Sequence, residues 1–139
     1  MRYWDASALV PLVVDELHSE ELRRLARDGD LVTWCLSAVE IASAIERRSR
    51  EGALAASERR AAIENLVELG EVWTEITAVA LVRERACRLL AVHALRAADA
   101  LQLAAALAVA GDRPAQHQFI CADGRLRDAA AREGFRVQS

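Results

Sequence analysis

Residues 1–10, MRYWDASALV, place an isolated carboxylate where a strand gives way to a helix. Tyr3 and Trp4 are aromatic residues that favour strands, and Asp5 is followed at once by a small, apolar run that begins at Ala6. Asp is a common helix cap because its side-chain oxygen accepts an otherwise unpaired backbone N–H. The stretch therefore predicts a strand-to-helix turn. It leaves open whether Asp5 only caps the helix or also belongs to a site.

The composition fits one helix-rich globular domain over residues 1–139. Hydrophobic residues make up 53% of the chain and charged residues 28%, which allows a sizeable core and argues against disorder. The net charge is -3 and the pI is about 5.6, so the chain does not coat nucleic acid by charge alone. A nuclease must release its product, and local arginines can steer an acidic chain, so nucleic acid remains an open substrate class.

All 18 residues of the Lys+Arg count are arginines, and the sequence contains no lysine. This composition excludes a Schiff-base lysine, a phosphate-binding P-loop lysine and a catalytic Ser-Lys pair.

The cysteines are odd in number and far apart, which favours a reducing cytoplasm over a disulfide framework; they are Cys35, Cys87 and Cys121. The apolar run 6–14 has the length of a signal-peptide core, but Asp5 stands where a positive leader is expected and Pro11 interrupts the run. No apolar run approaches the roughly 20 residues that span a bilayer. We therefore expect a cytoplasmic protein with no membrane partner.

Short apolar segments alternate with segments of helical spacing. The expected strands are residues 2–4, 31–36, 71–76, 118–121 and 135–138. Besides the helix that starts near Ala6, the expected helices are residues 16–27, 37–50, 57–69, 78–93, 97–110 and 125–133, and a glycine follows four of these runs, namely Gly52, Gly70, Gly111 and Gly134. Alternation of this kind predicts an α/β fold, with a parallel sheet of four to five strands flanked by helices.

Four isolated acids lie at junctions between these segments: Asp5, Glu40, Asp99 and Asp123. Three of them come just after the carboxyl end of a predicted parallel strand, where open α/β sheets bind ligands. Asp99 begins an apolar helix that precedes a strand, so tertiary folding decides where it lies.

Each acid also has a structural alternative. Ser37 and Glu40 fit the S-x-x-E capping box, in which Glu40 only reaches back to the backbone. Asp123 begins an Asp-Gly turn dipeptide. Asp99 lies in a helix that is apolar nearly all round, where a carboxylate needs a partner, and Arg96 is the nearest one.

If the four carboxylates converge, they repel one another and some take up protons unless a cation compensates them. Their oxygens are hard ligands, which suits Mg²⁺ or Mn²⁺ better than zinc. Such ions activate water and stabilise in-line displacement at phosphorus. Ser7, two residues after Asp5, would hydrogen-bond a carboxylate or a metal-bound water, or would simply occupy the first turn of a helix.

Four blocks of the chain carry a family resemblance: YWDASALV, LSAVEIASAI, RAADALQLAAAL and FICADGRLRDAAAREGF. In order and spacing they resemble the PIN-domain ribonucleases, and among these the VapC-type toxins of toxin–antitoxin pairs. The resemblance implies a three-layer domain and Mg²⁺- or Mn²⁺-dependent cleavage of RNA, such as tRNA or rRNA. It also implies a homodimer and a VapB-type antitoxin that blocks the site.

Carried over residue by residue, the resemblance makes Asp5, Glu40 and Asp99 the three principal acids. Asp123 matches the fourth, more variable acid, and Asp128 is its rival one helical turn further on. Ser7 falls on a position that is often Ser or Thr. All four acids are expected to bind the metal and serve catalysis.

Other readings fit less well. A haloacid-dehalogenase-type phosphatase would need a second Asp where Ser7 stands and, like a phospho-receiver domain, a lysine. A stand-alone PIN nuclease without an antitoxin and a catalytically silent binding domain remain open. The histidines show no zinc-binding spacing, the tryptophans lie in predicted strands, and two arginine clusters are candidates for RNA contacts: Arg47, Arg48 and Arg50, and Arg83, Arg85 and Arg88.

Overall fold

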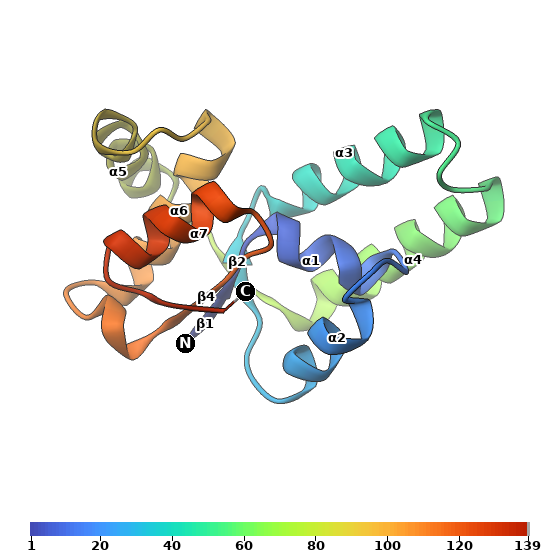
Figure 1. Ribbon diagram of the computed structural model, residues 1–139, viewed down its shortest axis with the longest axis horizontal. Coiled ribbons are helices and arrows are strands. Elements are labelled where there is room, and N and C mark those ends of the chain that lie inside the picture. The colour runs from blue at the N-terminus through green and yellow to red at the C-terminus, as the bar shows by residue number, and fades with distance from the viewer. Residues whose placement is uncertain (139) are drawn as a thin grey trace.

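The computed structural model describes residues 1–138, and in them a parallel sheet lies between two layers of helices (Figure 1). The strands are β1 (Arg2–Trp4), β2 (Val32–Trp34), β3 (Thr74–Ile76), β4 (Gln118–Ile120) and β5 (Arg136–Gln138). The helices are α1 (Ala6–Val13), α2 (Ser19–Arg27), α3 (Ser37–Arg50), α4 (Ala56–Val72), α5 (Val79–Val92), α6 (Ala97–Ala110) and α7 (Gly124–Arg132), with a 3-10 turn η1 (Pro114–Gln116). The predicted three-layer α/β fold is confirmed.

The chain begins at the centre of the sheet and builds outward on both sides. The strand order is β3-β2-β1-β4-β5, and every pair of neighbours is parallel. The order reverses between β1 and β4, where Trp4 lies opposite Ile120 and the Asp5 N–H donates to the Ile120 carbonyl over 3.1 Å. Ligand crevices form at such a reversal, beyond the carboxyl ends of the strands.

Adjacent residues of β1 supply the two halves of the core. Tyr3 and Trp4 are both 0% exposed, and they point to opposite faces because side chains alternate along a strand. Tyr3 packs with α5, α6 and α7 and stacks on Phe119 with ring centroids 5.2 Å apart. Trp4 packs with α1, α3 and α4 on the other face. The RYW stretch thus joins the two helical layers through one short strand.

The largest departure from prediction is at the third strand. Residues 71 and 72 belong to α4, Trp73 ends that helix, and the strand begins only at Thr74. Gly70 therefore lies inside α4 instead of following it. Leu66 and Leu69 pack against the same core cluster as Trp73, so continuing the helix keeps this apolar face buried.

The helix expected from residue 16 begins only at Ser19, and the strand expected over 31–36 covers Val32–Trp34. The other three glycine predictions hold. Gly52, Gly111 and Gly134 have positive φ angles at or after helix ends. Pro11 lies inside α1, which begins at Ala6. Among residues 1–138 no single helix is long and apolar enough to cross a bilayer; α5 and α6 meet such criteria only as a pair bent by 118°.

Candidate active site

The four predicted acids line one cleft at the carboxyl edge of the sheet. Asp5 follows β1, Glu40 lies in the first turn of α3, Asp99 in that of α6, and Asp123 precedes α7. The cleft has a volume of about 490 Å³, and Ser7 and Arg47 also line it. Two of these acids come from each helical layer, so the cleft exists only when both layers are docked.

Asp5 both caps a helix and faces the cleft. Its Oδ2 accepts the Ser7 N–H over 3.2 Å, and its Oδ1 accepts the Ser7 hydroxyl over 2.8 Å. The residue is only 3% exposed, and this burial raises its pKa to about 6, although the bonds from Ser7 oppose the rise. The carboxylate that caps α1 therefore also lines the cleft.

Ser7 ties two strand ends together. Besides donating to Asp5, its Oγ accepts the Ala122 N–H over 3.0 Å, just after β4. Ser7 thus fixes the Asp5 carboxylate relative to the segment that carries Asp123.

Glu40 does not form the capping box that was its structural alternative. Leu36 is the cap residue of α3, and it makes no side-chain cap bond. Glu40 Oε2 instead accepts a hydrogen bond of 2.5 Å from Gln102 Nε2 on α6. Burial raises the Glu40 pKa to about 7, the bond from Gln102 opposes this, and the charges of Asp5 and Asp99 add to the rise.

Gln102 is a site residue that the sequence analysis missed. It is 1% exposed and uses its whole amide: Oε1 accepts the Tyr3 hydroxyl over 2.5 Å, and Nε2 donates to Ser37 Oγ over 3.0 Å as well as to Glu40. The available signal was a lone amide in an apolar helix, three residues after Asp99 and therefore near it on the helix surface.

The bond to Ser37 explains why the capping box fails. Thr33 Oγ1 donates to the Trp4 carbonyl over 2.7 Å, so the Ser37 hydroxyl must donate across the 2.6 Å contact to Thr33. Ser37 is then left to accept from Gln102. A directed chain of hydrogen bonds runs from Gln102 through Ser37 and Thr33 to β1, and it holds the amide that orients Glu40.

Asp99 is partly buried, which raises its pKa, and the negative charge of Asp123 adds to the rise. Arg96 lowers this pKa through its charge and its backbone, yet no ion pair joins the two side chains in the described part of the chain. Arg96 therefore compensates the Asp99 charge only in part.

Asp123 is exposed and caps α7, where its Oδ1 accepts the Leu126 N–H over 3.1 Å. Its other carboxylate oxygen accepts no hydrogen bond within residues 1–138. Asp128 lines a different pocket with His93, Arg125 and Arg132. The geometry therefore groups Asp123, and not Asp128, with the other three acids.

Comparison with protein families agrees with this geometry. The family model of the PIN domain matches residues 2–131. The chain belongs to the PIN domain family. No curated protein matched the chain. Membership in this family supports a nuclease-type function.

The four carboxylates in the cleft of this PIN domain are chemically suitable ligands for a divalent cation. Asp5, Glu40, Asp99 and Asp123 offer only hard carboxylate oxygens. Burial disfavours the charged forms of the first three, and repulsion by neighbouring acids adds to this at Glu40 and Asp99. Within residues 1–138, however, no three His, Cys, Asp or Glu side chains stand close enough together to form a ready-made metal site.

The structure also shows where the tryptophans, the two arginine clusters and His93 lie. Trp4, Trp34 and Trp73 are buried in the core, as predicted. Trp73, however, ends α4 and does not lie in a strand. Arg47 lines the cleft of the PIN domain, whereas Arg48 pairs with Glu16 over 2.5 Å. The second arginine cluster lies on α5, away from the cleft. His93 is buried at the end of α5 and contacts Glu133.

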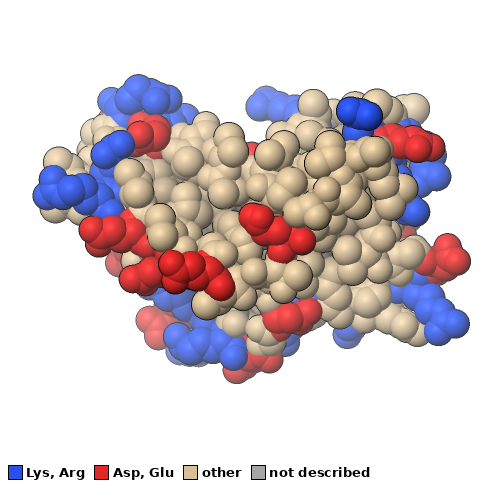
Figure 2. Space-filling model, turned by 180° about the vertical axis from the view of Figure 1, so that it is seen from behind, with Lys and Arg blue, Asp and Glu red and all other residues tan. Residues whose placement is uncertain are grey.

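Charges are unevenly spread on the back of the molecule. Figure 2 shows basic side chains towards both ends, separated by largely uncharged surface with a few acidic side chains. This face carries no continuous basic stripe of the kind that binds nucleic acid by charge alone.

Proposed function

We propose that this PIN domain is a divalent-metal-dependent endoribonuclease that acts as the toxin of a type II toxin–antitoxin pair. The observation that carries the proposal is the cleft in which Asp5, Glu40, Asp99 and Asp123 meet from four separate segments. No function of the fold alone requires four carboxylates there, since their repulsion and burial oppose folding of the empty cleft.

The residues of the cleft would have different roles in this function. Asp5, held by Ser7, and Glu40, held by Gln102, would bind Mg²⁺ or Mn²⁺ together with Asp99 and Asp123. When bound, the ion supplies charge that activates a water and stabilises in-line displacement at the phosphodiester. In the metal-free protein the Glu40 pKa is raised to about 7, so binding of the ion would release the Glu40 proton near neutral pH.

The residues of the cleft do not support a mechanism with a covalent enzyme intermediate. The chain has no lysine. The buried Cys121 thiol contacts Ser7 Oγ at 3.7 Å, but burial and the charge of Asp5 raise its pKa, which disfavours the nucleophilic thiolate.

The toxin role, the homodimer, the VapB-type antitoxin and the cytoplasmic setting are supported by the resemblance of the four sequence blocks. An antitoxin arginine would suit a cleft lined by four carboxylates. The substrate proposed is structured RNA such as tRNA or rRNA. A stand-alone PIN nuclease and a non-catalytic PIN-like domain are the two competing functions.

Expression of the chain alone in cells tests the role. The parent should arrest growth and leave new RNA ends, and Asp99→Asn should do neither. Cleavage without growth arrest would favour a stand-alone nuclease. Absence of both effects in the parent, at equal expression, would favour a binding domain.

A further inference from the structure

A second pocket adjoins the catalytic cleft, between α2 and the ends of β4 and β5. Its volume is about 410 Å³, within the usual range for small-ligand pockets. Leu22, Leu25 and Ile120 give it apolar walls. Ile120 of β4 also packs with the helical layer of α1 to α4, so the pocket lies at the edge of this layer.

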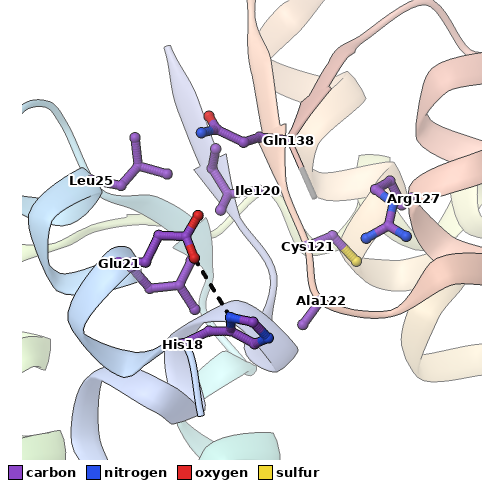
Figure 3. A pocket seen from close by; sticks show the side chains of 9 residues that line it. His18, Glu21, Leu25, Ile120, Cys121, Ala122, Arg127 and Gln138 are labelled. Atoms are coloured by element: carbon purple, nitrogen blue, oxygen red, sulfur yellow. Dashed lines mark ion pairs between the residues drawn. The ribbon is translucent and has the colours of Figure 1, made fainter.

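Polar groups of opposite charge face each other across this pocket. Figure 3 shows Glu21 and His18 on one side and Arg127 on the other. Glu21 contacts His18 at 3.5 Å, while no acidic side chain of residues 1–138 forms an ion pair with Arg127. Arg127 is therefore available to a ligand that brings hydrogen-bond acceptors.

The chemistry of Arg127 and Glu21 suits the two edges of guanine. O6 and N7 of guanine accept bidentate hydrogen bonds from an arginine. On its other side, N1–H and the exocyclic amine donate, as a carboxylate such as Glu21 requires. The apolar walls suit the faces of a flat, unstacked base.

The pocket opens toward the acids. His18, Leu22 and Ala122 line both it and an intervening hollow, and that hollow shares Ser7, Glu40 and Asp123 with the catalytic cleft. An RNA strand with its phosphate at the acids can therefore place a neighbouring base here. His18 has a φ of 73°, a left-handed conformation that is uncommon for a residue other than glycine, at the side of the pocket nearest that hollow.

We propose that this pocket binds an unstacked guanine base of the RNA, beside the phosphodiester that is cut. The inference rests on the proposed ribonuclease function, and it names the base that the site reads. Glu21 and Arg127 determine specificity and do not take part in the chemical step.

Two measurements test the pocket. The first titrates the metal-free protein with the four ribonucleoside monophosphates by calorimetry. Guanosine monophosphate should bind about tenfold more tightly than each of the others. Glu21→Gln and Arg127→Gln should remove this preference, and Arg125→Gln, on the same helix but outside the pocket, should keep it.

The second measurement maps cut sites on an RNA pool that is random around the cleaved bond. The parent should require guanine at one fixed position, and the two pocket variants should relax that requirement. Equal binding of all four nucleotides, no binding at all, or unchanged cut sites in both variants would overturn the inference. If the parent cuts no RNA, the ribonuclease proposal fails, and the titration still decides whether the pocket selects guanine.

Discussion

Gln102 and Glu40 join helices from opposite faces of the sheet, through a hydrogen bond of 2.5 Å from Nε2 to Oε2. The amide of Gln102 is held in turn by Tyr3 and Ser37. The orientation of a cleft carboxylate is therefore set inside the core, and Gln102 acts as a positioning residue.

Gln102→Leu should lower both stability and cleavage. The change leaves the Tyr3 hydroxyl, Ser37 and Glu40 without their partner, at a cost of about 1–3 kcal/mol in the free energy of unfolding. The bond from Gln102 lowers the Glu40 pKa, so its loss should also move the acidic limb of the pH–rate profile to higher pH.

Tyr3→Phe is the matched control for this change. It removes the bond to Gln102 Oε1 but keeps the bond from Nε2 to Glu40, so it should reduce stability and leave the pH–rate profile in place. A profile that is the same in parent and Gln102→Leu would refute the positioning role.

Glu40→Gln should change how stability depends on pH. The pKa of Glu40 is raised from 4.5 to about 7, so the folded, metal-free protein holds this proton more tightly than the unfolded chain. The stability that Glu40 contributes is therefore fully present below its unfolded pKa and is lost as the pH rises through about 7.

In urea unfolding without metal, the free energy of unfolding of Glu40→Gln should exceed that of the parent by roughly 1–2 kcal/mol at about pH 8. Solvent screening of this partly open group keeps that figure modest. Near pH 4 the two proteins should be almost equally stable. The same difference at both pH values would contradict the assignment of the raised pKa.

Divalent cations should stabilise the folded protein. Any ligand that binds only the folded state at 100 times its dissociation constant adds about 2.7 kcal/mol. The Tm of the parent should rise with Mg²⁺ or Mn²⁺, and that of Asp99→Asn should rise far less. Asp128→Asn should respond like the parent because Asp128 lies outside the cleft. An equal rise for all three proteins would place the ion elsewhere.

Ser7→Ala should weaken the Asp5 side of the site. It removes the bond from Oγ to Asp5 and leaves the Ala122 N–H without its acceptor, which should cost about 1 kcal/mol in stability and weaken the metal-induced rise in Tm. Ser43→Ala is the control, since Ser43 lines the same cleft but makes no side-chain hydrogen bond among the described residues. If both variants behave alike, Ser7 is only a first-turn helix residue.

The order of strands and helices could be predicted from the sequence because segments with strand spacing alternate clearly with segments of helical spacing. Both faces of β1 are also apolar or aromatic, which is typical of a buried central strand. The sequence also placed Asp5, Glu40 and Asp123 at strand ends, and parallel pairing brings strand ends together. It missed Gln102 and could not place Asp99, since both lie on a helix whose docking is a tertiary event. The capping box, which was the structural alternative for Glu40, does not form because Gln102 and Thr33 engage the Ser37 hydroxyl. A local sequence pattern cannot indicate that residues distant in the sequence will compete for the Ser37 hydroxyl.

The most direct test of the central claim is RNA cleavage by the purified protein in Mg²⁺ or Mn²⁺, with Asp99→Asn and Asp128→Asn compared at equal folded concentration. The account predicts that the parent and Asp128→Asn cut RNA, that Asp99→Asn does not, and that excess chelator stops the parent. Cleavage by Asp99→Asn at the parent's rate, or cleavage by the parent that persists in chelator, would contradict it.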